Sequence, residues 1–331
     1  MIEVRNLVKK YGNHLAVDHL SFTVEKGQIY GFLGPNGAGK STTMNIMTGY
    51  IASTEGAVII NGHDILEEPE EAKKCIGYLP ELPPLYMDMT VGEYLKFAAQ
   101  LKKIPKIERA SQLEEVMELV GIKEMEKRLI KNLSKGYKQR VGLAQAILGY
   151  PEIIILDEPM VGLDPKQIIE IRELIRKLSE NHTIILSSHI LSEVSEICDY
   201  IMIINKGKLV ASDTTENLSH MSFGANTLDL VIKGDRERLE GMLQGLEEIH
   251  EIEWKSCENG ECSVSIKTSE HVDLREKLFY FMAANQMPIL EMKSMKVSLE
   301  DVFLELTQSE VECEGESSKE DEKVKMEGGD E

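Results

Sequence analysis

The most informative segment of this sequence is Gly34-Pro35-Asn36-Gly37-Ala38-Gly39-Lys40-Ser41-Thr42. It fits the pattern Gly-x4-Gly-Lys-Ser/Thr, in which glycines let backbone N–H groups turn inward around a phosphate. The apolar run Ile29–Leu33 precedes it and an amphipathic segment follows, so the loop joins a strand to the N-terminus of a helix. We predict that Lys40 reaches the β- and γ-phosphates of a nucleotide and that Ser41 ligates Mg²⁺. A glycine-rich turn without a ligand is the alternative, and the flanking strand and helix argue against it.

A second stretch, Ile153-Ile154-Ile155-Leu156-Asp157-Glu158, is an apolar run that ends in two carboxylates. A carboxylate at the C-terminal end of a parallel strand lies at the edge of the sheet where ligands bind. We predict that Asp157 holds Mg²⁺ through water, and that Glu158 points in a different direction and polarises an attacking water. Alone, such a run is ordinarily just a strand end; the phosphate loop gives it a functional interpretation.

Length and composition set the broad class of the protein. With 331 residues, the chain is long enough for two domains at roughly 100–200 residues each. A hydrophobic content of 42% with 28% charged residues predicts globular domains with sizeable cores. The formal net charge of −20 repels phosphate backbones, so we expect no nucleic acid partner. A local nest of N–H groups can still hold a small phosphate in an acidic protein.

The sequence shows no signal for membrane insertion or secretion. No stretch approaches the roughly 18 apolar residues of a membrane-spanning helix, and the N-terminus lacks a secretory apolar core. We therefore expect a soluble, intracellular protein. Of the five cysteines, only Cys257 and Cys262 lie close together. Because no second Cys or His pair stands at ligand spacing, we expect reduced thiols in a hairpin rather than a zinc site.

Residues 1–220 alternate short apolar strands with amphipathic helices, which is typical of an α/β domain. Strands are expected at Met1–Leu7, Leu20–Val24, Ile29–Leu33, Ala57–Ile60, Ile153–Leu156, Thr183–Ser187 and Tyr200–Asn205. Ile153–Leu156 and Ile184–Leu186 are continuous apolar runs, as expected of strands buried on both faces. A helical region is expected at Val91–Lys103 and Ile107–Val120. Thr90 and Glu93 form a capping-box pattern at its start.

Residues 226–307 change to the order β-α-β-β-α-β, which predicts a small α+β domain of ferredoxin-like type. Its expected elements are Thr227–Lys233, Arg236–Gly245, Glu251–Lys255, Ser263–Lys267, Val272–Ala284 and Ile289–Lys293. This domain shows no catalytic constellation, so we expect an accessory role in dimerisation or regulation, with its methionines in the core. Residues 309–331 hold ten acidic and three basic residues and predict an acidic, disordered tail.

A third motif, Leu133-Ser134-Lys135-Gly136-Tyr137-Lys138-Gln139-Arg140, lies between the phosphate loop and the carboxylate pair. It resembles the signature sequence of ATP-binding cassette (ABC) ATPases. Tyr11 resembles the aromatic residue that stacks on adenine, Gly162-Leu163-Asp164-Pro165 the loop after the second carboxylate, and His189 the switch histidine. The resemblance covers roughly residues 1–220. It implies an α/β fold, a P-loop NTPase cassette with an antiparallel β subdomain and a helical subdomain.

The family resemblance also implies a mechanism. Two cassettes face each other head to tail, and each ATP lies between the phosphate loop of one and the signature helix of the other. Ser134 and Gly136 would present a hydroxyl, N–H donors and a helix N-terminus to the partner's γ-phosphate, with Asp164 at the interface. ATP binding would close the dimer, and hydrolysis assisted by Glu158 and His189 would open it. The chain holds one cassette, so the second is another copy of itself or a homologous cassette.

The resemblance assigns candidate residues to the cofactors ATP and Mg²⁺. The nucleotide-binding residues would be Tyr11, Val17, Gly34, Pro35, Asn36, Gly37, Ala38, Gly39, Lys40, Ser41, Thr42, Ser134, Gly136 and Asp164. The metal ligands would be Ser41, Glu81 and Asp157, and the catalytic residues Glu158 and His189. Two departures from the family pattern stand out. Glu81 replaces the usual glutamine, which adds a negative charge near the phosphates, and Lys135 and Tyr137 replace glycine and glutamine in the signature.

These departures resemble an exporter-type subfamily whose cassettes pair with a separate membrane subunit. The stretch Ser298-Leu299-Glu300-Asp301-Val302-Phe303-Leu304 resembles the C-terminal ending of that subfamily. The resemblance implies the ATP-hydrolysing subunit of an exporter, cytoplasmic and peripheral on the cytoplasmic face of the cell membrane. Its transmembrane permease would dock near Glu81 to Tyr94, where apolar residues gather. The transported substrate is not indicated, because in this family specificity lies in the membrane subunit.

Two alternatives stay open at this point. One is a regulatory partner in a heterodimeric transporter, which binds ATP and hydrolyses it weakly. Glu81, in place of the usual glutamine, is consistent with this alternative. The other is a soluble ABC ATPase of translation, repair or chromosome organisation. Such proteins carry two cassettes, long coiled coils or zinc modules, and the sequence shows one cassette and neither of the other features.

Overall fold

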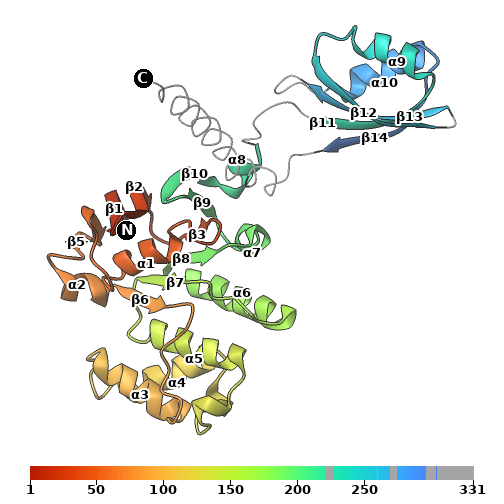
Figure 1. Cartoon of the computed structure of the whole chain (residues 1–331). Coiled ribbons are helices and arrows are strands. Elements are labelled where there is room, and N and C mark those ends of the chain that lie inside the picture. Colours follow the sequence, from red (N-terminus) through yellow and green to blue (C-terminus); the bar gives the residue numbers. More distant parts are fainter. Residues whose placement is uncertain (221–226, 259, 269–273, 296–302, 304–331) are drawn as a thin grey trace, which may run out of the picture. The chain divides into compact units, whose positions relative to one another are not determined.

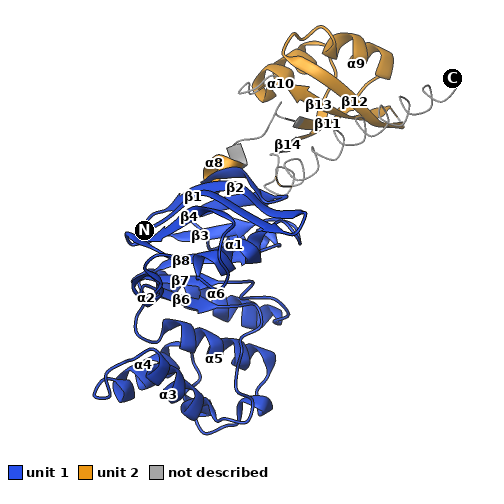
Figure 2. Cartoon of the chain, turned by 60° about the vertical axis from the view of Figure 1, so that its left-hand side comes forward, with its two compact units in different colours: residues 1–215 blue, residues 216–331 orange. Residues whose placement is uncertain are grey.

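The computed structural model describes residues 1–220, 227–258, 260–268, 274–295 and 303. The chain divides into two compact units, Met1–Thr215 and Glu216–Glu331 (Figure 2). The expected acidic tail at 309–331 lies outside the described residues. The motif at Ser298–Leu304 also lies outside them, except for Phe303.

The first unit is built around a six-stranded sheet in the order β10-β9-β3-β8-β7-β6 (Figure 1). Its strands are β3 (Ile29–Leu33), β6 (Ile76–Leu79), β7 (Ile153–Leu156), β8 (Thr183–Ser188), β9 (Tyr200–Asn205) and β10 (Lys208–Thr214). All neighbours are parallel except β9 and β10. Every residue of β3, β7 and β8 is buried, as expected of strands covered on both faces. The C-terminal ends of the parallel strands therefore meet at one edge of the sheet.

A second sheet of the same unit has the order β2-β1-β4-β5 and is antiparallel. Its strands are β1 (Ile2–Tyr11), β2 (His14–Val24), β4 (Glu55–Ile60) and β5 (His63–Asp64). Its buried face shares one core with helix α1 (Lys40–Met47) and the central sheet, through side chains such as Leu20, Phe32 and Met44. This is the antiparallel β subdomain that was expected.

The first unit also contains six further α-helices, and three of them, α3, α4 and α5, form a helical part at one end (Figure 1). The six helices are α2 (Pro69–Lys74), α3 (Val91–Leu101), α4 (Arg109–Leu119), α5 (Lys135–Ile147), α6 (Pro165–Ser179) and α7 (Leu191–Ser195), with short 3₁₀ turns at Lys123–Met125 and Ile130–Asn132. The capping box at the start of α3 is confirmed. Thr90 Oγ1 accepts a hydrogen bond from Glu93 N (3.2 Å), and Glu93 Oε2 accepts one from Thr90 N (2.9 Å).

The strand predictions differ from the structure where charged residues break the apolar pattern. The first strand was expected to stop at Leu7, but β1 continues through Lys9 and Lys10 to Tyr11, and β2 already begins at His14. These residues pair across the hairpin, and backbone hydrogen bonds rather than apolar burial hold them in the sheet. The strands β5 and β10 were also not expected. β5 has only two residues, and most residues of β10 are exposed or half-buried, so neither shows an apolar run.

In the second unit, helix α8 (Thr215–His220) is followed by the order β-α-β-β-α-β. The elements are β11 (Thr227–Lys233), α9 (Arg236–Leu243), β12 (Ile249–Glu258), β13 (Glu261–Thr268), α10 (Arg275–Ala284) and β14 (Ile289–Met295). The sheet has the order β12-β13-β11-β14 and all its pairs are antiparallel, which is the ferredoxin-like arrangement. Leu239, Leu278 and Met282 of the helices are buried in one core with Leu230 and Val264 of the sheet. Met282 and Met287 are thus core residues.

Cys257 and Cys262 form a disulfide across β12 and β13, with a Cα–Cα distance of 4.1 Å. The expectation of reduced thiols is wrong for this structure. The hairpin register sets the two residues directly opposite each other, and such pairing could not be deduced from their spacing alone. Cys75 and Cys198 are free.

Candidate active site

The phosphate loop joins the C-terminal end of β3 to helix α1. Gly37 and Gly39 have φ angles of 82° and 101°, a region that favours glycine. A Cβ atom on Gly39 would lie 2.5 Å from the carbonyl oxygen of Ala16, and one on Gly34 would lie 2.3 Å from that of Ile204. Close approach of the backbone therefore requires glycine at Gly34 and Gly39, and the positive φ favours glycine at Gly37 and Gly39.

Beside this loop lies a cavity of about 460 Å³, a volume in the usual range for a small-molecule site. It is lined by Tyr11, His14, Ala16, Asn36, Gly37, Gly39, Lys40, Ser41, Thr42, Glu81, Glu158, Val161 and His189. One end is formed by the β1–β2 hairpin and the other by the residues that follow β7 and β8. The structure thus brings together most of the residues that the sequence singled out for nucleotide and catalysis.

Several predicted residues do not line this cavity. Val17 is fully buried in the core, and its neighbour Ala16 lines the cavity instead. Gly34 and Pro35 contribute through their carbonyl oxygens, which accept hydrogen bonds from Lys40 Nζ at 2.7 and 3.3 Å. Ala38 is buried, and its N–H donates to the carbonyl of Pro35 at 3.1 Å within the loop.

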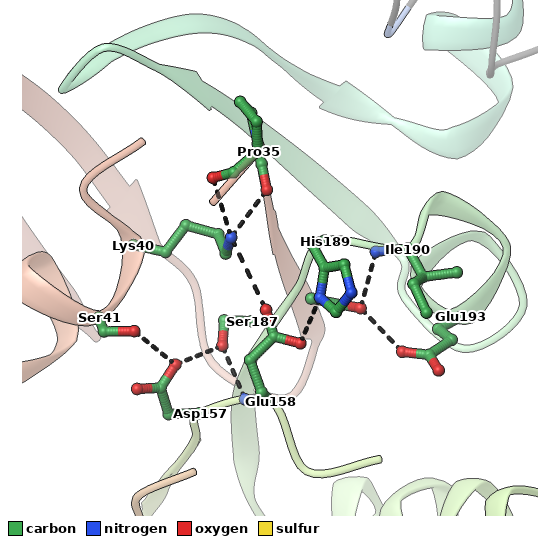
Figure 3. A network of polar contacts seen from close by, with 11 residues as sticks. Pro35, Lys40, Ser41, Asp157, Glu158, Ser187, His189, Ile190 and Glu193 are labelled. Carbon is green, nitrogen blue, oxygen red and sulfur yellow. Dashed lines mark hydrogen bonds and ion pairs between the residues drawn. The ribbon is translucent and has the colours of Figure 1, made fainter. Parts of the chain in front are cut away.

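Lys40 is buried between its own loop and the catalytic candidates (Figure 3). Its Nζ lies 3.7 Å from Glu158 Oε1. Burial lowers the pKa of Lys40, while the nearby carboxylates of Glu158 and Asp157 act in the opposite direction. The ammonium group is therefore already desolvated and held at the cavity, where a phosphate would replace its present partners.

Asp157 and Ser41 form the oxygen cluster predicted for a metal (Figure 3). Ser41 Oγ donates to Asp157 Oδ1 at 3.3 Å, and Ser187 Oγ donates to the same oxygen at 2.6 Å. Glu81 lines the same cavity as Ser41. An all-oxygen donor set of a hydroxyl and carboxylates suits Mg²⁺, which takes its other ligands from water and phosphate. Within the described residues no group of three or more His, Cys, Asp or Glu is placed to hold a metal ion.

Glu158 points away from Asp157 and toward the cavity, although the two residues are adjacent (Figure 3). Its backbone has a φ of 48°, in the left-handed region, and its N–H donates to Ser187 Oγ at 2.8 Å. The two carboxylate oxygens meet different partners, with Oε2 3.0 Å from His189 Nδ1 and Oε1 near Lys40. Glu158 thus links the phosphate loop to the histidine that follows β8.

At the other end of the cavity, Tyr11 is half-exposed at the end of β1. Lys9 Nζ lies 5.2 Å from the centre of its ring, so a cation already covers part of this aromatic surface. His14 also lines this end and was not singled out from the sequence. The two-residue turn between Tyr11 and His14 was the available signal, because it pairs these residues across the hairpin.

Ser134 and Asp164 lie outside this cavity and cap two helices. Ser134 Oγ accepts from Tyr137 N at 3.4 Å to begin α5, and Asp164 Oδ1 accepts from Gln167 N at 2.9 Å to begin α6. The two helix starts are in contact, because a Cβ on Gly136 would lie 2.5 Å from Gln167 Oε1. The roles that the family resemblance implies for Ser134, Gly136 and Asp164 toward a partner's nucleotide stay predictions.

The stretch expected to dock a membrane subunit is apolar and exposed. Leu82 is 79% exposed and Tyr86 is 56% exposed. Tyr86 precedes α3, and its ring packs edge-on against Phe97 and also contacts Tyr94, both of which lie on that helix. Among the described residues, no helix has the length and apolar character to cross a bilayer.

The phosphate loop, the carboxylate pair after β7 and the histidine after β8 define a P-loop nucleotide-binding domain. The family model of the ABC transporter matches residues 17–161. The bacitracin transport ATP-binding protein BcrA of Bacillus licheniformis is 36% identical over 308 residues, which cover 92% of this chain and 97% of BcrA. The linearmycin resistance ATP-binding protein LnrL of Bacillus subtilis is 32% identical over 308 residues, which cover 93% of this chain and 98% of LnrL.

Solved structures give the same result. An ATP-binding subunit of an ABC transporter superposes with a TM-score of 0.61 at 31% identity, over 66% of this chain and 91% of that one. A dimeric ATP-binding cassette in a post-hydrolysis state with ADP and Pi has a TM-score of 0.59 at 25% identity, over 65% and 99%. The chain belongs to the ATP-binding subunits of ABC transporters, a family of ATPases.

Proposed function

We propose that this chain is the ATP-hydrolysing subunit of an exporter and that it works as a closing dimer of cassettes. The observation that carries the proposal is Glu158, held between Lys40 and His189 at the phosphate end of the cavity. This places a carboxylate, a cation and an imidazole around the position where a terminal phosphate would lie. The names of two relatives, a bacitracin transport protein and a linearmycin resistance protein, support export.

The chemistry follows from how these three side chains would be redistributed. A nucleotide in the cavity would offer its phosphates to Lys40 and to N–H groups of the loop. The ammonium group of Lys40 would then contact the phosphates in place of the Glu158 carboxylate, and Glu158 would become available to accept a proton from an attacking water. His189 Nδ1 lies 3.0 Å from Glu158 Oε2, so the imidazole could position the carboxylate next to the terminal phosphate. Mg²⁺ bound by Ser41, Asp157 and Glu81 would neutralise charge on the phosphates.

The cavity is incomplete by itself, which supports the dimer. The N-termini of α5 and α6, capped by Ser134 and Asp164, do not line it. Helix N-termini of this kind bind anions, so we assign them to the nucleotide of a second copy or of a homologous cassette. The known dimeric cassette with ADP and Pi supports this arrangement. The second unit, with its own core, is proposed as an accessory dimerisation or regulatory domain.

A transmembrane permease is the proposed membrane partner. The exposed Leu82 and Tyr86 offer an apolar surface beside Glu81, and Glu81 itself lines the nucleotide cavity. A partner seated there would sense nucleotide through the short segment between these residues. The chain would accordingly work at the cytoplasmic face of the membrane.

The test compares ATP hydrolysis by the wild type, by Glu158→Gln and by Glu152→Gln, with size-exclusion chromatography in Mg-ATP. Glu152 is a matched control, a surface glutamate paired with Lys26. General-base catalysis is worth on the order of 100- to 10,000-fold, so E158Q should lose at least 100-fold in kcat and accumulate as an ATP-bound dimer. E152Q should behave as the wild type. Tight ATP binding without hydrolysis by the wild type, even with a permease present, would instead favour the regulatory partner.

A further inference from the structure

The geometry points to Ser187 as the positioning residue that sets Asp157 and Glu158 in their separate roles through one hydroxyl group. This inference rests on the proposed function. Ser187 lies on β8, outside the phosphate loop and the carboxylate pair, and has no direct access to the cavity. Its effect on the reaction has to pass through the two acidic residues.

The hydroxyl of Ser187 uses one donor and one acceptor function, and both go to the carboxylate pair (Figure 3). Its proton is donated to Asp157 Oδ1 at 2.6 Å. Its oxygen accepts the backbone N–H of Glu158 at 2.8 Å. Because both bonds meet at one atom, the side chain of Asp157 and the backbone of Glu158 are fixed relative to each other.

The register of the sheet places Ser187 at this point. Leu156 of β7 is paired with Leu186 of β8, so the next residues along the two strands, Asp157 and Ser187, lie side by side. The side chain of Ser187 is fully buried, so no water can replace its hydroxyl without rearrangement. The contact between Ser187 and Asp157 therefore follows from the pairing of β7 with β8 and lies in the buried interior.

The bond to the backbone of Glu158 has a specific consequence. Glu158 is held at a φ of 48°, a region that non-glycine residues rarely adopt and that costs free energy. This turn of the backbone sends the Glu158 side chain into the cavity while the Asp157 side chain turns to Ser41. Loss of the Ser187 hydroxyl removes the partner that holds the N–H in this conformation.

The adjacent serine has a different function, which separates the two positions. Ser188 Oγ donates to Glu193 Oε2 at 2.8 Å and accepts from Ile190 N at 3.0 Å. These contacts hold the loop that carries His189 and do not reach the carboxylate pair. Of these two serines, only Ser187 bridges the two carboxylate residues.

The experiment uses the full-length protein with Ser187→Ala and a matched control, Thr183→Val. Thr183 is a buried residue on the same strand, and its Oγ1 accepts the N–H of Gly27 at 3.0 Å, at the end away from the cavity. Both variants remove one buried hydroxyl from β8 and leave one N–H without its partner. Any general weakening of the strand should therefore appear in both.

Three quantities are measured: ATP affinity without divalent metal, Mn²⁺ affinity in the presence of ADP by electron paramagnetic resonance, and kcat with KM for ATP hydrolysis. Residues that orient metal ligands typically contribute about 10- to 100-fold in metal affinity or activity. We expect S187A to lose about tenfold in Mn²⁺ affinity and at least tenfold in kcat, with metal-free ATP affinity and KM within about twofold. Ser187→Cys, which keeps a weak donor, should lie between S187A and the wild type.

Two results would overturn the inference. If S187A and T183V show the same small loss of thermal stability and neither changes Mn²⁺ affinity or kcat, Ser187 only fills space. If S187A loses metal-free ATP affinity to the same extent as kcat, the substitution disturbs the whole site and not the carboxylate pair. The Mn²⁺ measurement does not depend on hydrolysis, so a wild type that fails to turn over ATP contradicts the proposed function and still tests Ser187.

Discussion

Each unit of this chain contains an aspartate that accepts a hydrogen bond from a serine on the neighbouring strand, and the two pairs differ in what else reaches the carboxylate. In the second unit, Ser265 Oγ donates to Asp229 Oδ1 at 2.7 Å, and Lys255 Nζ lies 2.8 Å from both carboxylate oxygens. In the cassette, Asp157 accepts from the hydroxyls of Ser187 and Ser41, and it forms no ion pair with any described residue.

The difference separates a carboxylate whose charge is compensated by a lysine from one that is held only by hydroxyl groups. Lys255 on β12 pairs with the negative charge of Asp229 on β11, and Ser265 on β13 donates to the same carboxylate, so these contacts link the three strands. Asp157 is oriented by the hydroxyls of Ser41 and Ser187, an arrangement that would suit the proposed role as a Mg²⁺ ligand.

The largest expected effect is on ATP hydrolysis, through Asp157→Asn compared with Asp229→Asn. D157N removes the charge that would hold Mg²⁺, and metal-based stabilisation of several kcal/mol corresponds to a loss of about 100-fold or more in kcat. D229N should leave kcat within about twofold, because its charge is already paired inside the second unit. Phosphate release at saturating Mg-ATP measures both kcat values. Equal losses in the two variants would show that Asp157 and Asp229 do not differ in their effect on hydrolysis.

The disulfide of the second unit gives the next effect. A cross-link that closes a loop this short stabilises by about 2 kcal/mol in the chain-entropy account. Cys257→Ser, or reduction of the wild type, should therefore lower the unfolding free energy of the second unit and leave ATP hydrolysis unchanged. Trp254 on β12 is the single tryptophan of the chain, so its fluorescence during urea unfolding follows this unit. A loss of hydrolysis on reduction would show that the second unit controls the cassette.

A smaller effect is expected on the stability of the second unit in D229N. Loss of the ion pair and weakening of the bond from Ser265 should destabilise the unit by about 1 kcal/mol, since the carboxylate is partly exposed. Trp254 fluorescence in urea measures this change. Asp88→Asn is the control, because Asp88 is a highly exposed, lysine-paired aspartate of the cassette. An unchanged midpoint in D229N would mean that solvent screens the Lys255 pair completely.

The smallest effect is a dependence on pH. The hydrogen bonds from Lys255 and Ser265 hold the pKa of Asp229 below its ordinary value of 3.8. The unfolded chain therefore takes up a proton before the folded chain does as the pH falls, and the stabilisation, fully present above the ordinary pKa, is lost below it. Between pH 6 and pH 3, the Trp254 transition should weaken more in the wild type than in D229N. Parallel losses in both proteins would exclude Asp229 as the source.

Local patterns predicted much of the fold correctly. The bounds of β3, β7, β9 and β11 agree with the structure, because continuous or alternating apolar residues are bounded by clear turn signals. The capping box at Thr90 agrees for the same local reason. By contrast, β10 and the Cys257–Cys262 bond were missed, since both depend on a partner strand and not on the residues themselves.

The same division applies to the site. The phosphate loop, the carboxylate pair and the histidine could all be identified from local sequence, because spacing and residue type within a few positions define these motifs. The position of Glu158 between Lys40 and His189, and the bridge from Ser187 to Asp157 and Glu158, depend on the folded sheet and could not be predicted from local sequence. Those contacts come from the pairing of β7 with β8 and of β8 with β3. Strand order and register join residues far apart in the chain, and packing of the whole sheet fixes them.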